Sequence, residues 1–544
     1  MSSKKRVVII GLDSINLEII NPLINEKKLP VLEKLLSKSA FSSMSSVLPV
    51  NAASGWTSLL TGKNSGKHNI FDFYDKTNGS YNRNIISSHD IKSKRVWDIL
   101  GDHQRKSIVM NIQVTYPPTP INGIMVSGML TKPDSVFTYP ENLSEELKSK
   151  KYIIDVFGHY RKTLTGYLEL AFQTIIYRQQ AFLELIKNNE WDFAALAFTT
   201  LDRLQQTIWE KKSQIEKIFI KLDELIGQIL TEVNDGNTYV LLVSNYGYSQ
   251  VNKKFFVNEW LSDLGLLSKN ISTSKASIPN LIDDYFDFKE QKSRMTARIL
   301  AKTGITKDNI RSVVPEFICE VLKKKIPTKI RKIFPKENLI INWDKTKAYF
   351  PSEYMQGIRI NLKGREPKGV VEKGWKYDRL CETIISELYR LKDPHTFENI
   401  IERVYRREEI FPGQNHDSAP DIIFVLRDNR YSLQSNKRTN RHYISNANDD
   451  YPVTSGMAPT GLFCIMGPSI QHGKLAHSPK VQDIAPTILE LLNVHVPGDM
   501  EGTVLSHIIE SKQNIETKPT IDSKTNKGSQ PDKTREIAVQ DALV

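Results

Sequence analysis

The chain has 544 residues, of which 40% are hydrophobic, and a formal net charge of +12. This length can bury a large core and by itself allows roughly three domains. Cys319, Cys381 and Cys464 lack metal or redox spacing, which excludes a disulfide framework. No apolar run is long enough to span a bilayer, and Met1–Arg6 lacks the features of a secretory peptide, so we expect a soluble cytoplasmic protein.

The first predicted element is a short apolar run, Arg6–Asp13, which indicates a buried parallel strand with Asp13 at its carboxyl end. Apolar spacing typical of helices follows between about residues 140 and 232. Two later apolar runs, Tyr239–Ser244 and Gly461–Pro468, predict further core strands.

The order of these elements predicts an α/β fold built as one large domain with insertions. Residues that could form a site come from distant parts of the chain, as expected for loops at the carboxyl ends of parallel strands. The expected parts are an N-terminal part of the core at 5–135, a helical segment continuing it at 136–235, a core strand and site loop at 236–252, a basic mixed insertion at 253–340, a C-terminal part of the core at 341–510 and a disordered tail at 511–544.

Several segments together resemble the alkaline phosphatase superfamily, in particular its type I phosphodiesterase / nucleotide pyrophosphatase branch and the predicted phosphohydrolase-phosphomutases within it. The segments are Arg6–Asp13, Trp56–Phe73, Gly123–Gly128, Leu201–Gln205, Asn361–Gly369, Ala419–Asp421 and Asp483–Leu489. The resemblance covers about residues 5–508 in one order. It implies a mostly parallel central sheet flanked by helices, with helical and mixed insertions.

The resemblance also implies a reaction and a site. Members of this superfamily use two divalent metals, often zinc, about 4 Å apart, to hold a phosphoryl group while a Ser or Thr attacks it. The pattern requires an early Asp, the nucleophile, an Asp-x-x-x-His, an Asp-His pair and a late His. Imidazole and carboxylate together hold zinc tightly, whereas an uncharged amide does so poorly and alanine not at all.

This chain keeps two of those ligands. Asp13 matches the early Asp, and Asp202 matches the Asp of Asp-x-x-x-His. In the second element the His is replaced by Gln206.

The other positions have changed. The Asp-His pair falls on Asn245 and Tyr246, and the late His falls on Ala458. The nucleophile should stand four residues before Trp56, where the chain has Ala52. A small register shift would bring in the hydroxyl of Ser54 instead.

Two alternatives remain for the retained carboxylates. Asp13 and Asp202 can be structural groups that accept backbone hydrogen bonds. Together with Asn245 and Gln206 they can instead offer oxygen ligands to a hard ion such as magnesium, manganese or calcium. The ring of Tyr246 would fill the space that a second metal needs.

The remaining notable groups have simpler interpretations. His68 lies in a segment where the family carries His as framework, and His472 and His477 are expected on the surface. The segment Lys323–Lys332 concentrates positive charge, which allows contact with nucleic acid or an anionic membrane. Because aromatic residues and a nucleic-acid motif are missing around it, a solvated basic face is favoured.

The leading hypothesis is a catalytically degraded family member that acts as a binding, scaffolding or regulatory protein. Its partner would be another protein or a phosphorylated small molecule, with no metal or with a divalent one, zinc by resemblance. The alternative is an active metal-dependent phosphohydrolase or phosphodiesterase with a non-standard site. A basic nucleic-acid or membrane-surface binder is the third hypothesis.

Overall fold

The structure is a computed structural model that describes residues 4–272, except 77–79, 82, 133 and 157–162, and residues 338–509, except 415, 436–442 and 447–454. The predicted basic segment 323–332, the predicted tail 511–544 and most of the predicted insertion 253–340 lie outside these residues.

The core is a nine-stranded sheet, most of whose neighbouring strands at the centre are parallel. Its strand order is β22 (Gly473–Lys474), β2 (Ala40–Ser45), β21 (Thr460–Met466), β9 (Thr238–Ser244), β1 (Arg6–Leu12), β8 (Phe193–Phe198), β5 (Ser107–Met110), β6 (Gly123–Val126) and β7 (Thr138–Tyr139). The antiparallel pairs are β21 with β2 and β9, and β6 with β7. The predicted α/β class and the mostly parallel sheet are confirmed.

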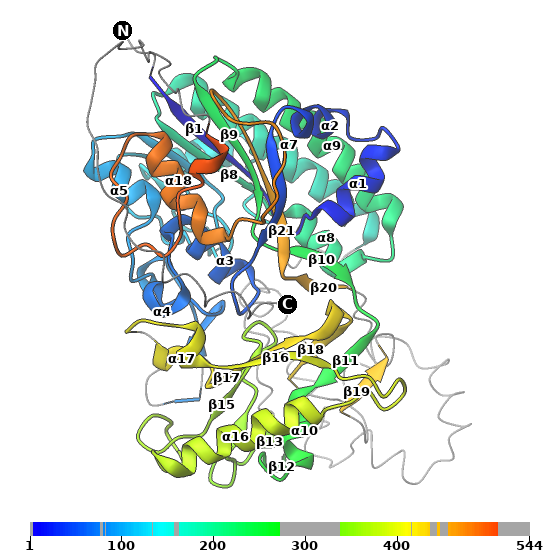
Figure 1. Ribbon diagram of the computed structural model, residues 1–544. Helices are drawn as coiled ribbons and strands as arrows, with labels where there is room; N and C mark the ends of the chain where they lie inside the picture. The colour runs from blue at the N-terminus through cyan, green and yellow to red at the C-terminus, as the bar shows by residue number, and fades with distance from the viewer. Residues whose placement is uncertain are drawn as a thin grey trace, which may run out of the picture. The chain divides into compact units, whose positions relative to one another are not determined.

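Helices cover both faces of this sheet (Figure 1). One face carries α3 (Ala52–Thr61), α5 (Val96–Asp102) and α18 (Ile484–Leu491). The other carries α1 (Leu17–Asn25), α2 (Pro30–Ser37), α6 (Leu143–Ser149), α7 (Leu164–Asn188), α8 (Thr200–Ile208) and α9 (Lys212–Val233). Strand β1 shows why both faces are apolar, because Val7 and Ile9 pack on the first side and Val8 and Ile10 on the second.

A smaller region has its own hydrophobic core. A four-stranded sheet joins β14 (Ala348–Tyr349), β15 (Gly357–Ile360), β17 (Ile422–Leu426) and β16 (Ile401–Arg406), and a three-stranded sheet joins β18 (Tyr431–Gln434), β11 (Lys253–Phe256) and β19 (Ile444–Asn446). Helices α10 (Val257–Asp263) and α16 (Trp375–Arg390) supply further apolar side chains.

The described residues also form three small two-stranded sheets, two short α-helices and several 3-10 turns. The sheets are β10 (Gly247–Gln250) with β20 (Ser455–Ala458), β12 (Lys269–Ser272) with β13 (Asn338–Ile341), and β3 (Tyr74–Lys76) with β4 (Arg83–Ile85). The short helices are α4 (Ser65–His68) and α17 (Arg407–Ile410). Within the described ranges, none of the helices combines the length and apolar character that crossing a bilayer requires.

Candidate functional site

The predicted site residues meet at one edge of the central sheet. Strands β1, β8 and β9 are parallel neighbours, so their carboxyl ends lie side by side. Asp13 directly follows β1, Asp202 lies in the first turn of α8 after β8, and Asn245 and Tyr246 follow β9. Ala458 ends β20, just before the antiparallel strand β21, and so reaches the same edge.

The nucleophile position lies at the start of α3. Asn51 caps this helix, its side-chain oxygen accepting a hydrogen bond from the Ser54 amide at 2.9 Å. The Asn51 side-chain amide donates to the Phe71 and Tyr354 carbonyls, at 2.9 and 3.1 Å. Ala52 is the first helical residue and is buried. Where the resemblance predicts the nucleophilic hydroxyl, the chain therefore has a methyl group.

Ser54 does not supply the missing hydroxyl. Its side chain is fully buried, and its Oγ donates to the Pro49 carbonyl at 2.9 Å. The hydroxyl therefore stabilises the loop before α3 through this hydrogen bond.

The Asp13 carboxylate is held by two neutral donors. Trp56 Nε1 donates to it at 2.6 Å, and Gln113 Nε2 at 3.0 Å. Trp56 approaches closely because position 11 is glycine, where an added Cβ would lie 2.4 Å from the indole ring. Burial, and then the negative charge of Asp202, raise the pKa of Asp13 to about 7, although both hydrogen bonds act to lower it.

The Asp202 carboxylate has charged and neutral donors. Arg203 Nη1 donates to one of its oxygens at 2.7 Å, and the Tyr246 hydroxyl donates to the other at 2.9 Å. Arg203 also forms an ion pair with Asp155 at 3.0 Å. Burial is the main cause that raises the pKa of Asp202, and the positive charge of Arg203 opposes it.

Asn245, which the resemblance aligns with a family carboxylate, is completely buried. Neither its Oδ1 nor its Nδ2 has a hydrogen-bond partner among the described residues. It lies against α3 where position 55 is glycine, since a Cβ there would be 2.2 Å from Asn245 Nδ2. The side chain is therefore tightly enclosed and unsatisfied.

The last two predicted positions are Gln206 and Ala458. Gln206 is exposed and hydrogen-bonds the Tyr354 side chain. Ala458 is buried in the ladder between β10 and β20, opposite Gly247. Neither position brings a charged group to the site.

A cavity of about 20 Å³ remains where these residues meet. Such a volume holds about one water molecule. Its lining combines predicted site residues with bulky neighbours: Ala52, Phe73, Met129, Asp202, Arg203, Gln206, Tyr246, Tyr354 and Met457. Tyr354 comes from the smaller region, and its ring packs edge-on against Phe73 at a centroid distance of 5.6 Å.

A family model confirms the resemblance. The model of type I phosphodiesterase / nucleotide pyrophosphatase matches residues 7–451. The chain belongs to the type I phosphodiesterase / nucleotide pyrophosphatase family. This is a family of phosphoric ester hydrolases whose members depend on divalent metal, typically zinc. No curated protein sequence matches the chain.

Solved structures agree with the alkaline phosphatase-like fold of this family. Wild-type alkaline phosphatase PafA is 12% identical, with a TM-score of 0.52, over 94% of this chain and 100% of that chain. An inactive variant of murine ectonucleotide pyrophosphatase/phosphodiesterase 5, in complex with AMP, is 10% identical, with a TM-score of 0.51, over 93% of this chain and 100% of that chain. At such low identity these likenesses concern the fold alone.

The residues present do not fit the two-metal centre of the type I phosphodiesterase family. Both oxygens of Asp202 already accept hydrogen bonds, one of them from a guanidinium that would repel a metal cation. Among the described residues, no group of three or more His, Cys, Asp or Glu is placed to hold a metal. The donor set thus keeps the carboxylates of Asp13 and Asp202 but lacks the imidazoles that complete a zinc site.

Buried His68 has a role in the framework. Its Nδ1 accepts a hydrogen bond from the Ile70 amide at 3.1 Å, so its Nε2 carries the proton and donates to Ser58 Oγ at 2.8 Å. Burial lowers the pKa of His68 to about 3. His472 and His477 are exposed.

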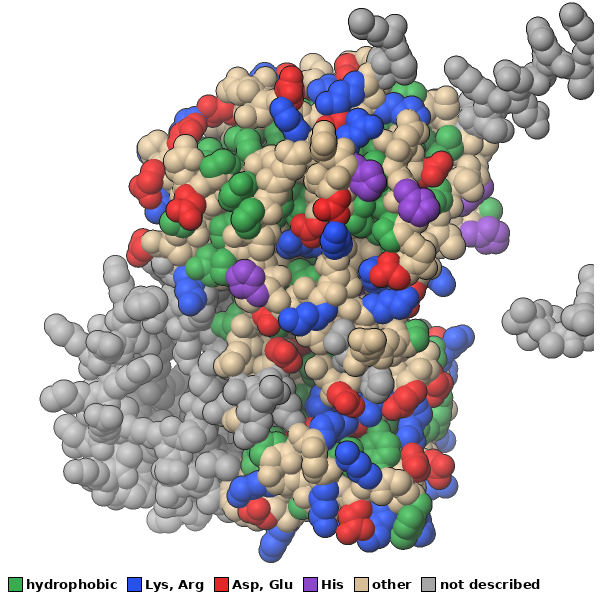
Figure 2. All heavy atoms as spheres, turned by 90° about the vertical axis from the view of Figure 1, so that its left-hand side faces the viewer, with side chains coloured by type: hydrophobic (Ala, Val, Ile, Leu, Met, Phe, Trp, Pro, Cys, Tyr) green, Lys and Arg blue, Asp and Glu red, His purple; other side chains and the backbone are tan. Residues whose placement is uncertain are grey.

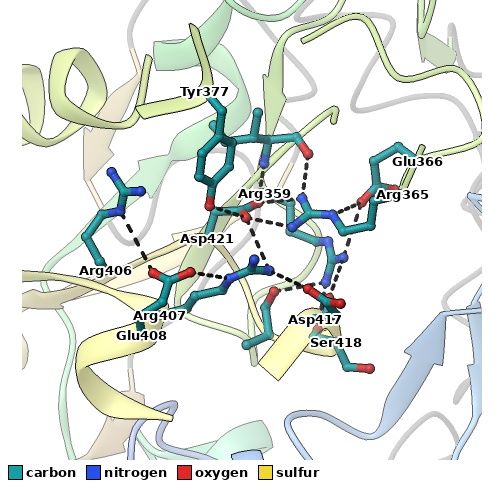
Figure 3. Close-up of polar contacts among 12 residues, drawn as sticks. Arg359, Arg365, Glu366, Tyr377, Arg406, Arg407, Glu408, Asp417, Ser418 and Asp421 are labelled. Atoms are coloured by element: carbon teal, nitrogen blue, oxygen red, sulfur yellow. Dashed lines mark hydrogen bonds and ion pairs between the residues drawn. The ribbon is translucent and has the colours of Figure 1, made fainter. Parts of the chain in front are cut away.

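Two segments that carried the family resemblance lie in the smaller region and form a buried ion network (Figure 3). Asp421 accepts two hydrogen bonds from Arg365, both at 2.6 Å, one from Tyr377 at 2.8 Å and one from the Ile360 amide at 2.6 Å. Glu366 binds Arg359 and Arg365. Burial alone would raise the pKa of Asp421, but Arg365 lowers it below its ordinary value. These motif residues therefore hold the small sheet together.

Sequence reasoning missed several residues of the site. Arg203 stands beside Asp202 in the sequence, and a cation next to a ligand position was the available signal. Gln113, Asp155 and Tyr354 give no such signal, because only the folded chain brings them to this edge.

Proposed function

We propose that this chain is a non-hydrolytic member of its family that acts as a binding, scaffolding or regulatory protein. The observation that carries the proposal is the filled reaction centre. Its cavity of about 20 Å³ compares with roughly 300–1,000 Å³ for pockets that hold small ligands. A phosphoryl group and two cations have no room there.

The chemistry of the side chains supports the same conclusion. Ala52 has no lone pair with which to attack phosphorus, and the Ser54 hydroxyl is used by the Pro49 carbonyl. Asn245 cannot neutralise a cation as a carboxylate does. Nucleophile and metal ligands each stabilise the transition state of phosphoryl transfer, so losing them together removes most of the rate enhancement.

The test is hydrolysis of p-nitrophenyl phosphate and bis(p-nitrophenyl) phosphate with zinc, manganese, magnesium or calcium added. We expect the chain and its Asp13→Ala variant to give the same background rate. Turnover that depends on added metal and disappears in Asp13→Ala would overturn the proposal. Circular dichroism of both proteins shows that the comparison is between folded chains.

The nucleotide bound by the murine neighbour provides a second probe. We expect isothermal titration calorimetry with AMP to give no heat of binding, because the cavity is far smaller than a nucleotide. Binding of AMP that is lost in a Gln206→Ala variant would show that the site opens to ligands.

A protein partner is the more natural ligand of a chain with a closed centre. On the face that Figure 2 shows, positive and negative side chains are interspersed. A partner that binds such a surface does not depend on the reaction centre. We therefore expect it to associate equally strongly with the unsubstituted chain and with Asp13→Ala. A partner lost on this substitution would point back to the altered centre.

A further inference from the structure

The buried cation at the reaction centre belongs to the protein itself. We propose that Arg203, assisted by the Tyr246 hydroxyl, takes the place of a metal cation at Asp202, so that this chain folds and keeps its sheet edge assembled without a divalent metal. The inference rests on the proposed function only in treating the centre as one without a catalytic metal.

The contacts of Arg203 are those of a charge-neutralising group. Its Nη1 donates to Asp202 at 2.7 Å, while its Nε and Nη2 donate to the two oxygens of Asp155 at 3.3 and 3.0 Å. The side chains of Asp155, Asp202 and Arg203 are 7%, 6% and 8% exposed. A planar guanidinium with several donors suits two carboxylates at once, as a single point charge would not.

Tyr246 completes the replacement. Its hydroxyl donates to the Asp202 oxygen that Arg203 leaves free, and its ring is completely buried. Asp202 would carry an uncompensated buried charge without these donors. In the family this compensation comes from metal, whereas here it comes from one side chain adjacent in sequence and one that follows β9.

The first experiment measures dependence on metal. The purified chain is incubated with zinc, manganese, magnesium or calcium, desalted and measured by mass spectrometry, and its thermal midpoint is recorded with and without EDTA. We expect no stoichiometric metal and no shift of the midpoint. A retained equivalent of metal, or a midpoint lowered by EDTA, would overturn the inference.

The second experiment removes the protein's own cation. Arg203→Met keeps much of the side-chain length but leaves Asp155 and Asp202 unpaired, so we expect the thermal midpoint to fall by several degrees. Arg390→Met is the matched control, since that arginine is 72% exposed and its ion pair among the described residues is with Glu387 on the surface. Equal midpoints for the two variants would contradict the role of Arg203.

A milder variant keeps the test open if Arg203→Met does not fold. Tyr246→Phe removes one hydroxyl that binds Asp202, while the Tyr248 side chain still hydrogen-bonds this carboxylate, so a smaller fall of the midpoint is expected. A midpoint as high as that of the unsubstituted chain would count against the inference.

The outcomes separate this inference from the proposed function. A chain that binds metal tightly but hydrolyses neither ester would refute the replacement by Arg203 and leave the non-hydrolytic function intact. Hydrolysis without metal that Asp13→Ala abolishes would refute the non-hydrolytic function and leave the replacement by Arg203 intact.

Discussion

Two buried polar clusters in this molecule contain residues from segments that resemble the family. They differ in how fully their polar groups are hydrogen-bonded. Around Asp421 in the smaller region, the motif residues are present and the carboxylate accepts four hydrogen bonds. Around Asp202 at the edge of the large sheet, the resemblance predicts that most ligand positions are replaced, and Asn245 nearby has no hydrogen-bond partner among the described residues. The first cluster is therefore fully satisfied in the fold, and the second contains a buried amide that is not.

The largest expected effect comes from breaking the intact cluster. Asp421→Asn removes the charge that balances Arg365 and leaves this buried guanidinium with Glu366 as its remaining carboxylate partner. We expect the free energy of unfolding to fall by about 3–5 kcal/mol, as measured by denaturant titration. Asp344→Asn is the control, because this side chain is 68% exposed and pairs with Lys368 on the surface. A loss no greater than in that control would refute the structural role of the network.

The next effect concerns Asn245, whose buried side-chain amide has no hydrogen-bond partner among the described residues. Gly55→Ala forces a methyl group against Asn245, and we expect a loss of about 1–3 kcal/mol in the free energy of unfolding. In an Asn245→Ala background the loss should vanish, because the clash and the unpaired amide disappear together. Gly101→Ala in α5 is the control, since its added Cβ would come no closer than 3.6 Å to a neighbour. A loss that persists in the double variant would show that the helix and not the amide resists the change.

The stability of the fold should depend on pH through the buried side chain of His68. The pKa of His68 falls from its ordinary value of 6.5 to about 3 in the fold, so below pH 6.5 the unfolded chain binds a proton that the folded chain does not. The contribution of His68 to stability is therefore complete above pH 6.5 and is lost as the pH falls toward 3, by about 1.4 kcal/mol per pH unit. Denaturant midpoints from pH 7.5 to 5 should fall less steeply in His68→Gln. Parallel pH profiles would contradict this assignment.

Ser54→Ala should have the smallest effect. The substitution removes one hydrogen bond to the Pro49 carbonyl and is expected to cost about 1 kcal/mol. Any residual hydrolysis of p-nitrophenyl phosphate should be unchanged, because the hydroxyl does not face the cavity. A rate that falls with this substitution, at unchanged circular dichroism, would favour the alternative of an active enzyme that uses Ser54.

The sequence was sufficient for the fold because strands such as Arg6–Leu12 carry uninterrupted apolar runs, and motif segments occur in the family's order. It also located the edge at which Asp13, Asp202 and Tyr246 meet. The assignment of Asp13 and Asp202 as retained ligand positions, and of Tyr246 as a lost one, stays a prediction.

What the sequence could not supply were contacts between distant segments. The Asp155–Arg203 ion pair joins residues from different parts of the chain, and the closeness of Tyr354 depends on how the smaller region meets α3. Neither contact leaves a periodic or compositional signal. The Asn361–Gly369 and Ala419–Asp421 segments suggested the family correctly, but only their hydrogen bonds identify them as structural.

The pairing of β12 with β13 brings together the described residues on either side of 273–337. Ser272 lies opposite Asn338, so the two ends of this segment are neighbours in an antiparallel ladder. A short Asn-Gly turn could join them without displacing either strand. The shortened chain would lack Lys323–Lys332. Weaker binding to anionic vesicles or nucleic acid than that of the full chain would show that this basic stretch makes the contact, and equal binding would show that it does not.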